Sequence, residues 1–374
     1  MRKQYLDNLR LMVVLFLIPY HTFVFYIYFD FDFYLRGAKV LSTTVLMMLY
    51  SPWAMSLLFV VSGISSYYAL QKRSNAEYVK ERLTKLLIPF IFGITLVMPV
   101  AIYYKDRFHS GYSGSFFQYF SRLFSNSPEI TETSVEFAVG PTWFLGVLFL
   151  ISIITLPIMR KYLNSSKRLH LDKVPLIVLI LLFIFPLVGG QLFHFVDKMP
   201  IAYLFEVLLG FFVFSDESVL EKVGKYRFLL SAISVAGLIS LVIVTFLGPV
   251  DPDIGMNILS NPGTLNVILT IYFHFVAWIS ILALLGMGKN YMNISNKVTK
   301  YLSESSFTIY LFHMPWLVAI GYYVLIYISS VPLQIISMIV LTTIASFVSY
   351  EILKRFSVTR FMFGIKAPKR KAKE

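Results

Sequence analysis

The chain has 374 residues, of which 57% are hydrophobic and only 14% are charged, whereas soluble domains contain about 25% charged residues. This composition excludes an ordinary soluble protein and predicts a chain that crosses a membrane several times. The formal net charge of +13 does not indicate nucleic-acid binding, because the basic residues fall in segments between the apolar runs. The absence of cysteine excludes disulfides, thiolate metal ligands and cysteine nucleophiles, and we expect no metal site.

The first apolar segment, residues 9–28, contains the two residues on which the functional hypothesis rests. About 20 residues at 1.5 Å each cross a hydrocarbon core of about 30 Å, so a transmembrane helix is predicted. Arg10 and His21 then lie on one helix face, about 16 Å apart along the axis. An ionisable residue at membrane depth indicates a functional site. Pro19 cannot donate to the carbonyl of Leu15, so a kink is expected beside His21.

The rest of the chain predicts an all-α fold, a polytopic transmembrane bundle of about ten helices. The positive-inside rule places both termini in the cytoplasm, with the plasma membrane as the expected location. The sixth segment is short and contains an acid, Glu206, and Gly189-Gly190 before it are expected to mark a break. We expect one membrane domain over residues 1–354 and a basic cytoplasmic tail over 355–374 that is attracted to anionic lipids. The ten predicted segments are 9–28, 44–70, 86–104, 142–159, 174–190, 200–214, 228–247, 264–287, 307–328 and 331–353.

A second group of residues lies at the predicted cytoplasmic end of the third segment. Arg82 and Lys85 are three residues apart and are expected to share a helix face. A guanidinium binds phosphate through two hydrogen bonds, and an ammonium adds a point charge. Arg10 is expected at the same membrane level, so the three cations are predicted to surround a polyphosphate. The competing interpretation, favoured by composition alone, is that these cations only anchor the topology.

A third group surrounds His313 in the ninth segment. His313 is predicted in the cytoplasmic half of the membrane, where it approaches the cavity below His21, or else bonds a carbonyl freed by Pro315. Spacing alone does not separate these alternatives. Glu206 is a second ionisable residue in a span, and its role as functional or structural is left open. Trp143, at a span entrance, is typical of an interfacial anchor.

Five motifs, taken together and in order, resemble the acyltransferase-3 family of integral membrane acyltransferases. The motifs are Tyr5-Leu-Asp7-Asn-Leu-Arg10 with His21, Leu-Phe-Val-Val-Ser62-Gly63, Arg82-Leu-Thr-Lys85-Leu-Leu-Ile-Pro89, Pro141-Thr-Trp143-Phe-Leu and Tyr310-Leu-Phe-His313. Within the family, three segments look most like the branch that succinylates periplasmic glucans: Ile-Pro19-Tyr-His21, Ser62-Gly63-Ile-Ser-Ser-Tyr-Tyr and Tyr350-Glu-Ile-Leu-Lys-Arg-Phe. The chain departs from the family pattern at Lys85, where arginine is frequent, and at Glu206, where an apolar residue is more usual.

The resemblance implies a ten-span enzyme that takes an acyl group from cytoplasmic acyl-CoA and delivers it to a hydroxyl of a glycan or other envelope acceptor. It also implies that His21 and Arg10 are the functional pair, with Arg82 and Lys85 on the donor side. We expect His21 to act as a general base in a direct transfer, with His313, Glu206 and Trp143 as supporting candidates and acyl-CoA as a substrate rather than a bound cofactor. The competing hypothesis is a proton-coupled transporter or flippase without chemistry.

Overall fold

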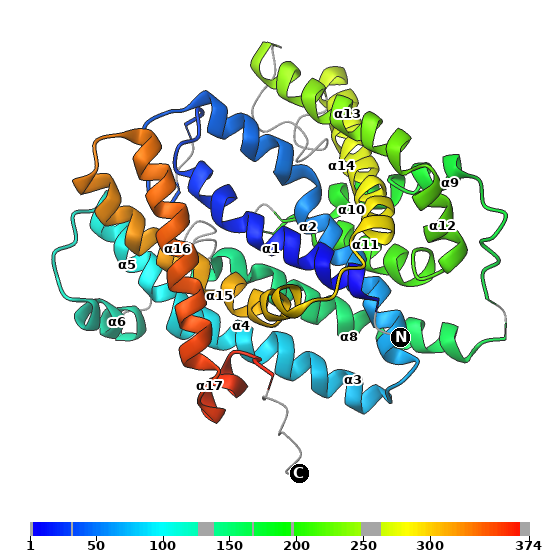
Figure 1. Ribbon diagram of the computed structural model, residues 1–374, viewed down its shortest axis with the longest axis horizontal. Coiled ribbons are helices and arrows are strands. Elements are labelled where there is room, and N and C mark those ends of the chain that lie inside the picture. Colours follow the sequence, from blue (N-terminus) through cyan, green and yellow to red (C-terminus); the bar gives the residue numbers. More distant parts are fainter. Residues whose placement is uncertain are drawn as a thin grey trace. The chain divides into compact units, whose positions relative to one another are not determined.

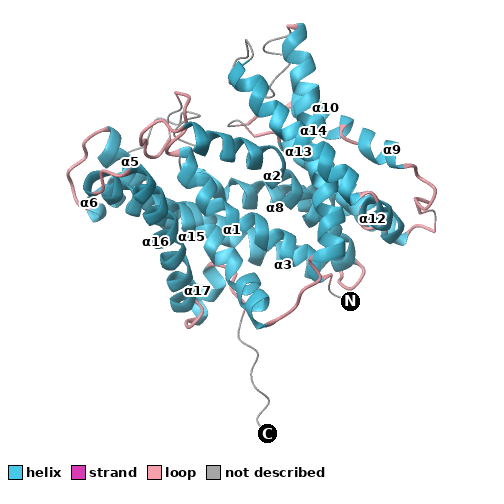
Figure 2. Cartoon of the chain, turned by 45° about the horizontal axis from the view of Figure 1, so that its top comes forward, coloured by secondary structure: helices cyan, strands magenta, loops and turns pink. Residues whose placement is uncertain are grey.

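The structure is a computed structural model (Figure 1) that describes residues 3–30, 33–125, 138–166, 168–195, 198–247 and 263–366. Over these residues the secondary structure is helical, and Figure 2 shows helices joined by loops with no strand. The prediction of an all-α fold is therefore confirmed. The chain forms two compact units, described separately below. The first unit comprises residues 1–13, 45–79 and 150–296, and the second comprises residues 14–44, 80–149 and 297–374.

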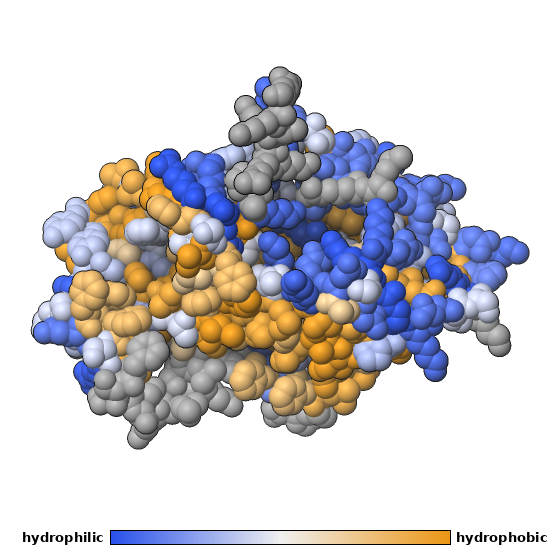
Figure 3. All heavy atoms as spheres, turned by 90° about the horizontal axis from the view of Figure 1, so that it is seen from below, coloured by the Kyte–Doolittle hydropathy of each residue, from blue (hydrophilic) through white to orange (hydrophobic). Residues whose placement is uncertain are grey.

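Seven helical stretches of the described residues are long and apolar enough to cross a membrane, so the prediction of a polytopic membrane protein is confirmed. The other predicted crossings fall on α1 (Gln4–Val24) and on two shorter apolar stretches, Leu176–Leu192 and Pro200–Phe212. Many large hydrophobic side chains are exposed, and they form broad orange areas in Figure 3. The seven stretches are α2 (Leu41–Leu70), α3 to α5 (Asn75–His109), η3 and α8 (Gly140–Asn164), α13 (Arg227–Leu247), α14 (Thr264–Tyr291), α15 (Lys297–Tyr327) and α16 (Val331–Leu353).

In the first unit, α2 packs against α11 (Pro200–Phe212) at a contact between backbones. A Cβ atom on Gly63 would lie 2.1 Å from the carbonyl oxygen of Val207, and one on Gly210 would lie 2.2 Å from that of Val60. Small residues allow helices to approach this closely, and membrane proteins use such contacts where water cannot drive association. The Ser62-Gly63 motif therefore has a packing role at this crossing.

The predicted segment 174–190 is divided into two short helices, α9 (Leu176–Leu181) and α10 (Ile184–Leu192). The expectation of a break at Gly189-Gly190 was wrong, because both glycines lie inside α10, where they pack against the start of α11. The break instead lies at residues 182–183. Pro186 explains this position, since it has no N–H to donate to the carbonyl four residues earlier.

The first unit also contains α12 (Glu217–Lys225), which packs against α14. Asp216 caps α12 by accepting a hydrogen bond from the backbone N–H of Ser218 at 2.8 Å. Glu217 forms ion pairs with Lys289 at 2.7 Å and with Lys3 at 2.6 Å. These contacts connect the start of the chain and the end of α14 to one short amphipathic helix.

In the second unit, α15 packs against α16 and α5 (Met98–His109). The loop after α1 closes over these helices, with Tyr26 Oη donating a hydrogen bond to Gln334 Oε1 at 3.1 Å. Helix α1 itself continues unbroken through Pro19 to Val24, so the proline does not end it. The core of this unit includes Phe25, Tyr26, Tyr34, Leu35, Met98, Ala101, Met314, Leu317, Val318, Val324 and Met338.

The helical stretch Asn75–His109 is not a regular α-helix. It runs through α3 (Asn75–Arg82), α4 (Ile88–Phe92) and α5, with π-helical segments at Leu83–Leu87 and Gly93–Val97 between them. Each π-helical segment directly precedes a proline turn, at Pro89 and Pro99, where a missing N–H and a steric clash disturb the hydrogen-bond ladder. The expectation that Arg82 and Lys85 share a face assumed α-helical spacing, whereas Lys85 lies in a π-helical segment, so the shared face stays a prediction.

The second unit also contains two short helices. Helix α6 (Phe116–Ser125) follows α5, and helix α17 (Ser357–Met362) follows α16. Helix α17 lies in the predicted basic tail and contacts α4. The lysines and arginine of the tail at 369–373 lie outside the described residues.

Candidate functional site

Two histidines meet in the second unit, one from α1 and one from α15. The Nε2 atom of His313 lies 3.2 Å from the Nδ1 atom of His21, although 292 residues separate them in the sequence. The ring centroids are 5.1 Å apart. His313 is fully buried, whereas His21 is partly exposed. The partly exposed His21 is therefore in contact with a histidine, His313, that solvent does not reach.

Each histidine also contacts a carbonyl of its own helix. His21 Nδ1 lies 3.0 Å from the carbonyl oxygen of Leu17, and His313 Nδ1 lies 2.6 Å from that of Tyr310. Of the two interpretations of His313 left open by the sequence, the structure shows the approach to His21, while the carbonyl that His313 contacts is not the one expected. That carbonyl belongs to Tyr310 and not to Leu311, whose hydrogen bond Pro315 removes.

Aromatic rings surround the pair. Phe33 stacks on His21 with ring centroids 6.4 Å apart and an interplanar angle of 3°, and Tyr20 meets it edge-on at 4.9 Å. Phe33 lies in the loop after α1, where the sequence offers no periodic signal, so sequence reasoning missed it. Tyr20 and Phe33 thus place aromatic rings beside His21.

Tyr310 connects this group to the start of α8 (Trp143–Asn164). Its hydroxyl donates a hydrogen bond to the carbonyl oxygen of Pro141. Gly140 precedes this turn with φ +45°, a left-handed conformation that favours glycine. Trp143 begins α8 and contacts Phe144. The sequence places Tyr310 in a family motif, but the motif alone predicts no role for it.

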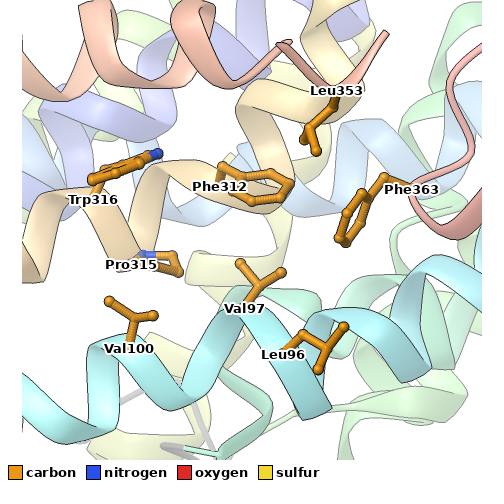
Figure 4. A pocket seen from close by; sticks show the side chains of 8 residues that line it. All are labelled: Leu96, Val97, Val100, Phe312, Pro315, Trp316, Leu353 and Phe363. Atoms are coloured by element: carbon orange, nitrogen blue, oxygen red, sulfur yellow. The ribbon is translucent and has the colours of Figure 1, made fainter. Parts of the chain in front are cut away.

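An apolar crevice of about 290 Å³ lies beside α15 in the second unit (Figure 4). Phe312, Pro315 and Trp316, which are close to His313 in the sequence, contribute to its wall, but His313 does not. Trp316 presents its ring, while its indole N–H donates to Ser349 Oγ at 2.9 Å. The crevice thus offers contacts for hydrocarbon rather than for a charged group. It is lined by Leu96, Val97, Val100, Phe312, Pro315, Trp316, Leu353 and Phe363.

Arg10 lies in the first unit and is held by α1 and α2. Its guanidinium forms an ion pair with Asp7 at 3.3 Å and donates hydrogen bonds to the carbonyl of Val61 and the hydroxyl of Ser65. About a third of the side chain is exposed (31%). The oriented and partly exposed guanidinium is chemically suited to an anion.

Lys85 lies in the second unit, where its ammonium donates to the carbonyl oxygen of Gly364 at 2.6 Å. This contact connects the chain after α17 to the helical stretch Asn75–His109. Arg82, at the end of α3, is half-buried in the same unit. Because Arg10 belongs to the first unit, its grouping with these two cations stays a prediction.

A sequence model of the acyltransferase-3 family, described as an acyltransferase domain, matches residues 3–351. The chain belongs to the acyltransferase-3 family. It is a membrane acyltransferase that transfers acyl groups other than aminoacyl groups. No curated protein and no solved structure matches the chain significantly. The competing transporter hypothesis has no support from these findings.

In this acyltransferase, two further buried ionisable residues, Glu206 and His274, lie in the first unit. Glu206 on α11 is 4% exposed and hydrogen-bonded to Ser56, and its Oε2 has no hydrogen-bond partner among the described residues. His274 Nδ1 lies 2.9 Å from the carbonyl of Thr270 on its own helix. Over the described part of the chain, no group of three or more His, Asp or Glu side chains is placed to hold a metal ion.

Proposed function

We propose that this acyltransferase moves an acetyl or succinyl group from cytoplasmic acyl-CoA to a hydroxyl of a glycan or other envelope acceptor, with His21 as general base. The observation that supports this proposal is the His21 and His313 pair, which presents one partly exposed imidazole held by a buried hydrogen-bond partner. A histidine in such a setting is suited to take the proton of an attacking hydroxyl. The resemblance to the glucan-succinylating branch favours succinyl among the acyl groups.

The donor is held, in this proposal, by Arg10, Arg82 and Lys85. The 3′- and pyrophosphate groups of coenzyme A carry several negative charges, and arginine is the side chain best matched to phosphate. Arg10 is already oriented by Asp7 and by α2 while part of its side chain is exposed. The helix spacing of about 16 Å between Arg10 and His21 leaves room for the pantetheine arm between phosphate and thioester.

The reaction is a direct transfer. The acceptor hydroxyl gives its proton to His21 as its oxygen attacks the thioester carbonyl carbon. The C–S bond of the tetrahedral intermediate then breaks, and the departing coenzyme A thiolate takes the proton from His21, which regenerates the neutral imidazole. Neither an acyl-enzyme nor a cysteine is required, and the chain has no cysteine.

For the topology, we propose ten crossings with both termini in the cytoplasm of a plasma-membrane protein. Helix α1, the pair α9 and α10, and α11 would supply the three crossings beyond the seven long stretches. Lysine and arginine in the loops support this orientation.

The test of the base is a thiol-release assay with the purified protein, acetyl-CoA or succinyl-CoA, and envelope glycans of the expressing cells as acceptor. Because the protein has no cysteine, a thiol-reactive dye reports only the released coenzyme A. The variants His21→Ala and His21→Gln should lose at least about 100-fold in kcat, since general-base catalysis contributes about 100- to 10,000-fold. His170→Ala, which changes an exposed histidine, is the matched control and should match the wild type.

If either His21 variant stayed within about tenfold of the wild type, His21 would not be the base. Mass spectrometry of envelope glycans from cells with wild-type protein or His21→Ala identifies acyl group and acceptor together. A labelled donor supplied without acceptor tests the direct transfer, because label bound covalently to the protein would contradict it.

A further inference from the structure

We infer that His313 is a positioning residue that fixes which nitrogen of His21 acts as the base, and that this nitrogen is Nε2. The inference rests on the proposed function and adds to it the proton arrangement of the pair. It depends on two carbonyl contacts and one contact between imidazoles, all within the second unit.

The first step concerns the protonation of His313. A carbonyl oxygen only accepts hydrogen bonds, so the 2.6 Å contact between His313 Nδ1 and the carbonyl of Tyr310 requires a proton on Nδ1. In a neutral imidazole the other nitrogen, Nε2, then has the lone pair and acts as an acceptor. This acceptor points at His21, 3.2 Å away.

The second step concerns His21, and two independent contacts agree. The carbonyl of Leu17, at 3.0 Å from Nδ1, requires a proton on that nitrogen. The acceptor Nε2 of His313 requires the same proton. The Nδ1–H of His21 is therefore shared between a backbone carbonyl and a neighbouring imidazole, and the lone pair that accepts a proton from the acceptor hydroxyl is on Nε2.

The third step concerns the charge that forms during transfer. When Nε2 takes the proton of the hydroxyl, His21 becomes an imidazolium, and its bond to His313 becomes charge-assisted and stronger. No proton passes from His21 to His313, because Nδ1–H stays on His21, and the proton on Nε2 goes on to the coenzyme A thiolate. His313 thus resembles in its role the carboxylate that holds the histidine of hydrolytic triads, but it is a neutral acceptor.

The burial of the two rings fits these different roles. His313 is fully buried and is bonded on one side to the backbone and on the other to His21. His21 is partly exposed. Phe33 stacks parallel to the His21 ring. The residue that touches substrate is therefore His21, and His313 acts through it.

The test compares two amide variants of His313. The amide of glutamine reaches the position of Nε2, so His313→Gln keeps an acceptor for His21. The amide of asparagine reaches only the position of Nδ1, so His313→Asn keeps the contact with Tyr310 but loses the acceptor. We expect His313→Asn to lose about 10- to 100-fold in kcat, the equivalent of one charge-assisted hydrogen bond, with the KM for acyl-CoA unchanged. His313→Gln should recover most of this loss.

The outcomes separate this inference from the proposed function. If His21→Ala is inactive while His313→Asn matches the wild type, the positioning role is refuted and the general base stands. If His313→Asn and His313→Gln lose activity equally, a structural role explains the loss and the inference is again refuted. If His21→Ala keeps activity within about tenfold, the base assignment and the inference fail together.

A second measurement needs no variant of His313. Imidazole ¹⁵N spectra of the full-length protein in detergent micelles contain signals from only six histidines, and His21→Gln identifies the one that disappears. We expect His21 to show a protonated Nδ1 and an unprotonated Nε2. A neutral ring with the proton on Nε2 would overturn the inference even if both amide variants failed to fold.

Discussion

Replacement of Gly63 by alanine tests whether the crossing of α2 and α11 holds Arg10, which we propose binds the donor, in place. The new Cβ would lie 2.1 Å from the carbonyl oxygen of Val207, against a lower limit of 3.0 Å for real Cβ contacts, so the helices must separate by about 0.9 Å. The obstructing atom is backbone, which no rotamer change can move. Overpacking of this kind costs about 1–3 kcal/mol.

The separation should also affect function, because α2 supplies the Val61 carbonyl and the Ser65 hydroxyl that hold Arg10. We expect Gly63→Ala to lower the thermal unfolding temperature and to raise the KM for acyl-CoA several-fold while kcat changes less, since Arg10 serves donor binding in our proposal. The assays are thermal unfolding of the purified protein and the thiol-release assay described above.

The matched control is Gly146→Ala, the same change in another membrane helix. Its Cβ would lie 3.2 Å from the ring of Phe90, a side chain that can adjust. A second variant, Gly210→Ala, places its Cβ 2.2 Å from the carbonyl of Val60 at the same crossing. Because one separation accommodates both methyl groups, the double variant should be destabilised by less than the sum of the single effects. Equal stability of Gly63→Ala, Gly146→Ala and wild type would refute this reasoning.

Two further predictions concern a hydrogen bond and an ion pair. Tyr310→Phe removes the hydroxyl that donates to the Pro141 carbonyl, so it should destabilise the protein by about 1–2 kcal/mol and lower the unfolding temperature. The control Tyr327→Phe, at an exposed tyrosine, should leave the unfolding temperature unchanged. Equal unfolding temperatures of the two variants would contradict the hydrogen bond. Partial burial raises the pKa of Glu217, but its ion pairs with Lys289 and Lys3 outweigh burial and lower this pKa below 4.5. The stabilisation of the folded protein by these ion pairs is therefore present above about pH 4.5, and it is lost as the pH falls through the lower pKa that Glu217 has in the folded state. Glu217→Gln should remove this acid dependence, worth less than about 1 kcal/mol at a partly exposed site, and an unchanged stability profile between about pH 3 and pH 7 would argue against it.

The sequence alone determined the class of fold and the chemistry that is available. Apolar segments long enough to cross a bilayer leave no alternative to helices, because backbone polar groups must be bonded within the segment. Ionisable residues inside such segments, including His21, His313 and Glu206, stand out because burial in hydrocarbon is costly. These two signals are local in the sequence, so they needed no tertiary information.

Local helix geometry was predicted less well. Pro89 and Pro99 are obvious in the sequence, but whether a helix kinks, ends or widens into π turns depends on the contacts that its neighbours make. The same holds for Pro186, which divides α9 from α10 while Pro19 leaves α1 continuous. A prediction based on regular α-helical spacing therefore does not describe the segment that contains Lys85, which is π-helical.

Only the tertiary structure decided which polar residues meet. His21 and His313 are 292 residues apart, and their 3.2 Å contact results from the packing of the second unit. Phe33 reaches His21 from a loop without periodicity, and Tyr310 reaches Pro141 across 169 residues. Spacing along a chain specifies the face of one helix, but the partner of that face is chosen by the packing of side chains from distant segments, which no single segment encodes.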